Sequence, residues 1–293
     1  MANRLKFVLV AFLFFVVGCN QSYEFYEEER EADTPKPSLF VVVKFRPAPG
    51  QFINEGYTVT SMSDACAYAQ QQLDRRSDLS LGGFGGYVVV KFKTPIINSG
   101  NYDFMIYGNS FVGGSEPGVV WVSCDSNKNG IADDEWFELY GSESGKKSTK
   151  SNYYITYSRT EDPTKISWLD SEGVCGVIER NTAHKQDYFP AWIAADSYTL
   201  SGTLLPDNSI WDEQSSRWVL NALEWGYADN YSAIDCTADK ANCFRISDAH
   251  DSLGEPANLQ SIDFVKVQSA INCANASIGE ASTEVRGFAL YGN

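Results

Sequence analysis

Residues 81–92 read LGGFGGYVVVKF, and this stretch indicates the fold class. Its second half, from Tyr87 to Phe92, is a run of β-branched and aromatic residues of the kind that forms strands. The glycines on both sides of Phe84 precede a strand and not a helix N-terminus, so they favour a tight turn over a phosphate-binding loop. The stretch therefore predicts a turn that leads directly into a β-strand.

Segments of the same character recur along the chain, separated by turn residues. We expect strands over residues 102–107, 119–124, 136–140, 153–158, 165–169, 198–203, 218–225, 262–267 and 288–291. Together with 14% aromatic residues, this pattern predicts a mainly β protein with two packed antiparallel sheets, as in a β-sandwich or jelly roll. A β-propeller is the alternative, but the blade-length repeats that it needs are not evident.

One short N-terminal helix is predicted over residues 63–76. Ser63 and Asp64 are capping residue types, and good helix formers follow them. No linker rich in proline and serine follows residue 40, so residues 39–293 are expected to form a single ligand-binding domain.

The N-terminus has the order of a secretory signal peptide. Arg4 and Lys6 precede an apolar run that is too short to span a bilayer comfortably and that ends just before Cys19. The four residues that end at Cys19, VVGC, resemble the lipobox of bacterial lipoproteins, in which the cysteine is acylated and becomes the first residue. We therefore expect residues 1–18 to be removed and Cys19 to anchor the chain in a membrane by lipid.

Residues 19–38 are acidic and contain two prolines, which predicts a flexible tether. Their position resembles that of the acidic export signal of Bacteroidetes lipoproteins, which implies display on the outer face of the outer membrane. A solvated linker without a sorting role is the alternative.

The net charge of −15 excludes nucleic acid as a partner, because binding phosphate groups along a nucleic acid requires a cationic surface. Removal of residues 1–18 takes away two cations and no acid, so the mature chain is more acidic still.

Six cysteines remain after Cys19, an even number in a chain expected in an oxidising compartment. Cys236 and Cys243 are the first candidates for a disulfide, because they are close in sequence and flank polar residues. A zinc site is the rival interpretation, but the chain has no CxxC motif and its only histidines are His184 and His250.

A calcium-type loop is predicted at residues 125–135, DSNKNGIADDE. Oxygen-bearing side chains occupy positions 1, 3 and 5, a glycine occupies position 6 and a backbone carbonyl falls at position 7, which is the spacing of EF-hand loops. The candidate ligands are Asp125, Asn127, Asn129, Ile131, Asp133 and Glu135.

The loop departs from the EF-hand at position 12, which is Trp136 and not a bidentate glutamate, and it lies between predicted strands. It is therefore closer to the calcium loops of β-rich extracellular proteins, where the cation has a structural role. A solvated acidic β-turn without a metal is the alternative.

Aromatic residues in polar surroundings suggest a binding platform, because exposed rings beside hydrogen-bonding groups can stack on a sugar or a flat cofactor. The candidate ligand-binding residues are Trp211, Trp225, Tyr227, Asp229 and Asn230. Ordinary packing under loops is the alternative.

No catalytic constellation is convincing, so we expect the protein not to be an enzyme. Asp248, His250 and Asp251 are interpreted as a polar loop, since residues so close in sequence rarely converge on one substrate. Glu280 and Glu284 are interpreted as part of a solvated loop, because the paired acids of glycosidases usually come from separate strands.

Several segments together resemble a family of largely uncharacterised Bacteroidetes cell-surface lipoproteins, often encoded with outer-membrane uptake systems for vitamin B12. The segments that carry the resemblance are residues 81–87, 102–111, 115–118, 125–138, 218–230, 262–267 and 279–285. The resemblance implies capture of a small nutrient such as a cobamide, which would be passed to a TonB-dependent outer-membrane transporter.

Three other functions are weighed against nutrient capture. A glycan-binding module of the cell surface would use the same aromatic residues. A secreted glycoside hydrolase would need two acids, such as Asp103, Glu116 or Glu280, to converge in a cleft. A purely structural surface protein would show neither a cleft nor exposed aromatic residues.

Overall fold

The computed structural model describes residues 38–275 and 279–292. The predicted signal peptide (1–18), the lipidation site Cys19 and the tether up to residue 37 lie outside the described residues, so they remain predictions. In the described part of the chain, no helix is long and apolar enough to cross a membrane.

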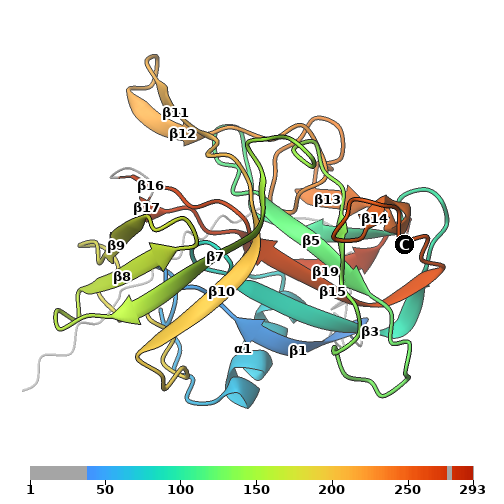
Figure 1. Ribbon diagram of the computed structural model, residues 1–293, viewed down its shortest axis with the longest axis horizontal. Coiled ribbons are helices and arrows are strands. Elements are labelled where there is room, and N and C mark those ends of the chain that lie inside the picture. The colour runs from blue at the N-terminus through green and yellow to red at the C-terminus, as the bar shows by residue number, and fades with distance from the viewer. Residues whose placement is uncertain (1–37, 276–278, 293) are drawn as a thin grey trace, which may run out of the picture. The chain divides into compact units, whose positions relative to one another are not determined.

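A six-stranded antiparallel sheet forms the centre of the domain (Figure 1). In spatial order its strands are β1 (Phe40–Arg46), β3 (Tyr87–Ile97), β15 (Ser261–Ser269), β5 (Gly118–Ser123), β6 (Phe137–Leu139) and β14 (Ala249–His250). The predicted strand after the glycine-rich turn is therefore β3, which is next to the central strand β15.

Smaller antiparallel sheets surround this one. The four-stranded sheet contains β10 (Ser197–Leu204), β7 (Lys150–Arg159), β8 (Lys165–Asp170) and β9 (Cys175–Glu179). The three-stranded sheet contains β13 (Ala241–Phe244), β4 (Phe104–Tyr107) and β19 (Gly287–Leu290). Two-stranded pairs join β11 (Ser209–Asp212) to β12 (Arg217–Leu220), β16 (Ala274–Asn275) to β17 (Gly279–Glu280), and β18 (Glu284–Val285) to β2 (Leu79–Ser80).

The predicted helix is α1 (Met62–Asp74), which packs against β1 (Figure 1). Its N-cap is Ser61 and not Ser63, because the Ser61 hydroxyl accepts a hydrogen bond from the Asp64 backbone N–H at 3.1 Å. The side chains of Ala65, Ala69 and Leu73 are buried, at the helical spacing of one face. A single 3-10 turn, η1 (Ile246–Asp248), precedes β14.

The main core lies on one face of the six-stranded sheet. Val265 and Val267 of β15 are fully buried there, together with apolar residues of α1 and of the three-stranded sheet, including Phe104 and Ile106. A second apolar cluster lies under the four-stranded sheet, where the Tyr157 hydroxyl donates to the Phe84 carbonyl at 2.8 Å. The glycine-rich turn is thus held in place by this second cluster.

The mainly β, antiparallel prediction with one short helix is confirmed, whereas the sandwich or jelly-roll arrangement stays a prediction. Several elements differ from the predicted ones, and β9, β11 and β13 were not predicted. Strand β12 ends at Leu220, short of the predicted 225. Strand β1 was not predicted, and a register shift between Val42 and Lys44 interrupts its alternation of inward and outward side chains.

A matched pair of isoleucine substitutions tests the position of the main core. We expect Ile106→Ala, at a fully buried side chain on β4, to lower the free energy of unfolding by about 3 kcal/mol, because it leaves a cavity. Ile97→Ala, at a side chain that is 66% exposed on β3, should change it by less than about 1 kcal/mol. Equal effects in urea denaturation would contradict this core.

Candidate functional site

The face of the six-stranded sheet opposite the main core carries a row of polar and aromatic side chains. The strand pairings place six residues side by side across all six strands. In spatial order the row is Lys44, Val89, Lys266, Trp121, Glu138 and His250. Because neighbours on a strand point to opposite faces, Lys266 stands on this face while Val265 and Val267 enter the core.

A cleft opens over this row. Its larger part, which we call the main chamber, has a volume of about 610 Å³ and is lined by Trp121, Trp136, Glu138, His250 and Lys266 together with the loop residues 144–146 and 251–254. A smaller part of about 250 Å³, which we call the recess, is lined by Lys44, Arg46, Tyr87 and Gln268. The two parts share Trp136, Ser201 and Lys266 in their walls, so they are adjacent.

The ammonium group of Lys266 lies among aromatic rings. Its Nζ atom is 4.3 Å from the ring centroid of Trp121, 5.5 Å from that of Trp136 and 5.9 Å from that of Tyr87. Ring faces attract a cation but do not neutralise it. Lys266 therefore brings a positive charge to the boundary between the main chamber and the recess.

Burial changes the protonation of two groups in the main chamber. It lowers the pKa of Lys266 to about 8, against the opposing charge of Glu138. It raises the pKa of Glu138 to about 7, although the Thr203 hydroxyl donates a hydrogen bond to the carboxylate. Near neutral pH both groups are thus close to their titration points, and a bound ligand can shift either one.

Strand β10 of the four-stranded sheet forms one wall of the cleft. Gln268 on β15 donates from Nε2 to the Ser201 carbonyl on β10 at 3.0 Å, and this bond joins the two sheets. Gly202 lies directly over Gln268, and a Cβ atom at that position would collide with the Gln268 Oε1 atom. A side chain at position 202 would therefore have to displace the Gln268 amide.

Several polar atoms in the cleft lining are buried without a hydrogen-bond partner. In the part of the chain that the structure describes, they include Arg46 Nε, Trp121 Nε1, His250 Nδ1 and Gln268 Oε1. An unsatisfied buried polar group is costly, and native proteins have few of them. Four of them belong to residues that line this one cleft, which makes the cleft a candidate site.

The predicted calcium loop forms part of the rim of the cleft, because Ala132 and Trp136 line the recess. Its turn has the expected geometry: Gly130 has a φ of 76°, and its N–H donates to Asp125 Oδ2 at 3.0 Å. Lys91 also donates to Asp125 Oδ2, at 3.1 Å, whereas Asp125 Oδ1 is buried without a partner.

The remaining predicted ligands form a network of short-range hydrogen bonds. Asn127 Oδ1 accepts from the Asn129 N–H at 2.9 Å, and Asn129 Oδ1 accepts from the Ile131 N–H at 2.7 Å. The Asn129 amide donates to the Asp133 carboxylate at 3.2 Å. The Glu135 carbonyl, not its side chain, is bound by the Ser123 hydroxyl.

A second cluster of acids lies elsewhere, and its members come from three distant segments. One carboxylate oxygen each of Glu116, Asp229 and Glu284 lies within 4.8 Å of the others. Among the residues that the structure describes, this is the group of acidic, histidine or cysteine side chains that could hold a metal ion. We call it the acidic triad; each member lies in a segment that carries the family resemblance described above.

Backbone N–H groups hold the acidic triad together. Asp229 Oδ1 accepts from Asn109 and Ser110, both at 2.9 Å, and Asp229 Oδ2 accepts from Glu284 at 3.0 Å. Burial raises the pKa of Glu116 to about 8 and that of Asp229 to about 7, and it raises the pKa of Glu284 well above its usual range. The acidic triad therefore retains protons at neutral pH unless a cation replaces them.

The structure does not gather the five predicted ligand-binding residues into one surface. Tyr227, Asp229 and Asn230 are buried, and the Tyr227 hydroxyl accepts a hydrogen bond from the Glu143 N–H at 2.8 Å. Trp211 is exposed on β11, where its ring meets that of Trp218 edge-on at 5.9 Å. A ligand role for Trp211 stays a prediction.

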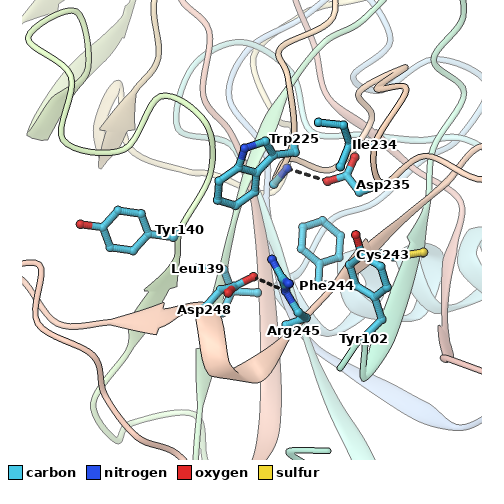
Figure 2. A pocket seen from close by; sticks show the side chains of 11 residues that line it. Tyr102, Leu139, Tyr140, Trp225, Ile234, Asp235, Cys243, Phe244, Arg245 and Asp248 are labelled. Atoms are coloured by element: carbon cyan, nitrogen blue, oxygen red, sulfur yellow. Dashed lines mark hydrogen bonds and ion pairs between the residues drawn. The ribbon is translucent and has the colours of Figure 1, made fainter. Parts of the chain in front are cut away.

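Trp225 lines a separate pocket of about 200 Å³ (Figure 2). Its charged groups have partners: Arg245 pairs with Asp248 at 3.0 Å, and Asp235 accepts from the Gly226 N–H at 2.6 Å. Because this pocket is smaller and its charges are satisfied, the cleft is the better candidate site. A ligand role for Trp225 also stays a prediction.

Cys236 and Cys243 are free thiols in the structure, as are the other described cysteines. Burial, followed by the charge of Asp235, raises the pKa of both thiols to about 11, so both stay protonated. Their pairing under oxidising conditions stays a prediction.

Of the acids considered for hydrolysis, Asp103 and Glu280 are buried and Glu116 is partly buried, and none of them lines the cleft. Asp103 accepts from the Ser99 and Ile246 N–H groups, and Glu280 accepts from the Gln51 N–H. The interpretation of Glu280 and Glu284 as a solvated loop is wrong, because their side chains are 6% and 4% exposed. Backbone N–H donors explain how these acids are accommodated in the interior.

Comparison with models of known protein families found no match, and comparison with curated protein sequences found none either.

The acidic triad predicts a pH dependence of stability in the presence of a chelator. The folded-state pKa values are raised, so the folded protein binds more protons than the unfolded chain between about pH 5 and pH 8. The free energy of unfolding should therefore fall as the pH rises through this range, by about 1.4 kcal/mol per pH unit for each extra proton that the folded protein holds.

Glu284→Gln keeps a hydrogen-bond donor but removes one of the three titrating groups. Between about pH 5 and pH 8, we expect the free energy of unfolding of this variant to fall by about 1.4 kcal/mol less than that of wild type, or by a still smaller amount. Glu179→Gln, at a side chain that is 68% exposed, should behave like wild type. Urea denaturation at several pH values measures both. The same slope in wild type and Glu284→Gln would rule out the acidic triad as the cause.

Proposed function

We propose that this protein is a non-enzymatic binding protein that holds a small organic ligand in the cleft. The observation that carries the proposal is the concentration of unpartnered buried polar atoms around it, on Arg46, Trp121, His250 and Gln268. A ligand with oxygen acceptors and a donor would satisfy these atoms and displace water from the aromatic rings.

The size and lining of the cleft also support a binding role. A volume of about 610 Å³ for the main chamber falls in the range of small-molecule sites. Trp121 and Trp136 offer apolar surface, and Ser201, Thr203 and Asn152 offer hydrogen bonds around it. Such a combination orients a ring-shaped ligand through stacking and fixes it through polar contacts.

Nutrient capture is the biological setting that we propose for this activity. The resemblance to lipoproteins of vitamin B12 uptake systems makes a cobamide the first ligand to test, with a TonB-dependent transporter as its recipient. In this proposal the domain is a β-sandwich, Cys19 carries the lipid anchor, and the protein is displayed on the outer face of the outer membrane. A glycan is the second candidate ligand, because two tryptophans among hydroxyl and amide groups also suit a sugar ring.

We further propose a structural calcium ion in the loop from Asp125 to Glu135. The turn at Gly130 and the unpartnered Asp125 Oδ1 support this proposal, since a calcium ion takes six to eight oxygen ligands. The ion would displace Lys91 from Asp125 and fix the loop that carries Trp136. Calcium would therefore hold one side of the cleft in place without contacting the ligand.

Substitution of Trp136 tests the location of the ligand site. We expect Trp136→Ala to weaken binding at least about tenfold, because it removes a ring from the wall shared by both parts of the cleft. The measurement is calorimetric titration with a cobamide and with a panel of neutral and acidic glycans. Trp211→Ala, on the exposed β11–β12 hairpin, is the matched control. Loss of binding in Trp211→Ala alone would move the site to that hairpin.

Thermal unfolding with and without calcium tests the loop. Because a ligand that binds only the folded state stabilises it, saturating calcium should raise the melting temperature of wild type, and Asp133→Ala should abolish that rise. Asp239→Ala, at an exposed acid outside the loop, should keep it. If the rise survives Asp133→Ala and disappears in Glu284→Gln, calcium binds the acidic triad and the loop proposal is wrong.

A further inference from the structure

The recess of the cleft is lined by three cationic side chains and by no acidic one. Lys44 and Arg46 come from β1, and Lys266 comes from β15 across the sheet. This arrangement is unexpected in a protein with a net charge of −15. The recess is therefore a local concentration of positive charge on an acidic protein.

These cations form no salt bridge among the described residues, although the charge of Glu138 in the main chamber acts on Lys266. Within the described ranges, ion pairs join other lysines and arginines, such as Lys91, Lys165 and Arg286, to carboxylates, but none involves Lys44, Arg46 or Lys266. Arg46 Nε is in addition buried without a hydrogen-bond partner. Since arginine cannot shed its proton, its charge in the recess calls for an external anion.

Aromatic rings hold the cations in position around the recess. Lys44 and Lys266 both face Tyr87, with Nζ atoms 5.7 Å and 5.9 Å from its ring centroid. The Arg46 guanidinium lies 5.4 Å from the ring centroid of Tyr198. Ring contacts of this kind orient the cations while leaving their N–H groups free to bind an oxygen acceptor.

We propose that the recess binds an oxyanion group of the ligand, a phosphate ester or a carboxylate, through Lys266, Arg46 and Lys44. The uncharged part of the ligand then occupies the main chamber against Trp121 and Trp136. This inference rests on the proposed function for the identity of the cleft, and it adds the chemical class of the ligand. An arginine fork together with two ammonium groups is suited to phosphate and carboxylate oxygens.

Titration with inorganic phosphate tests the recess directly. The full-length protein is titrated at constant ionic strength, with chloride as the control anion, and tryptophan fluorescence reports binding because Trp121 and Trp136 surround Lys266. We expect saturable binding in the millimolar range. Lys266→Met should weaken it at least tenfold, and Lys165→Met, on β8 and paired with Glu179, should leave it unchanged.

Lys44→Met is the second variant, because Lys44 is exposed and its replacement leaves the fold intact. We expect it to weaken phosphate binding about threefold, in line with the loss of one charge in partly solvated surroundings. Absence of saturable phosphate binding, or wild-type affinity in both Lys266→Met and Lys44→Met, would overturn the proposal.

A second titration uses glucose, glucose 6-phosphate and glucuronate, which share a pyranose ring and differ in charge. Binding of either anion at least tenfold more tightly than glucose supports the proposal, and the comparison of the two distinguishes a phosphate ester from a carboxylate. Equal affinity for all three overturns it while leaving ligand binding in the cleft intact. A third outcome is that phosphate binds in a Lys266-dependent manner but neither a cobamide nor any glycan of the panel binds. That outcome would refute only the proposed function.

Discussion

The alternation of side chains along β15 is the constraint on which both the core and the cleft depend. This strand lies between β3 and β5, so its register fixes the position of every residue in the sheet relative to the core. Val265 and Val267 are fully buried on one face, and Lys266 between them must therefore stand on the other. A slip of one residue would place the lysine in the core and two valines in the cleft.

The acidic triad and the cationic recess lie at different places in one domain, and their charges are compensated in different ways. The acidic triad can lower its charge by keeping protons, as the raised pKa values of Glu116 and Asp229 indicate. The recess has less freedom, because one of its three cations is an arginine, a residue type whose guanidinium group is always charged. No acidic side chain lines the recess, and this difference makes it the stronger candidate for recognition.

Local sequence patterns were sufficient for strands rich in β-branched and aromatic residues, such as β3, β7 and β15, and for helix α1. They did not yield β1 or the helix start at Ser61. The burial of Tyr227, Asp229 and Asn230 was also not predictable, because the N–H groups that satisfy Asp229 come from residues 55 to 120 positions away. By its polar composition alone, the segment from Tyr227 to Asn230 resembles an exposed loop.

The cleft was missed for a related reason. Each strand contributes one residue to the row, and a lysine flanked by valines at 265–267 is the kind of alternation that places it on the outer face. That alternation predicts the face of the sheet on which Lys266 lies, but not which residues of other strands lie beside it. The meeting of Lys266 with Trp121 and Glu138 depends on β15 pairing with β5 and β5 with β6, a strand order that no local pattern contains.

Gly202 shows how a residue without a side chain can control the dimensions of a binding site. It lets β10 approach Gln268 closely, so the distance between the two sheets is set at this contact. An added methyl group at position 202 would displace the Gln268 amide and disturb the bond that joins the two sheets. The fit of the cleft to a ligand would change, although the substituted residue carries no group that a ligand recognises.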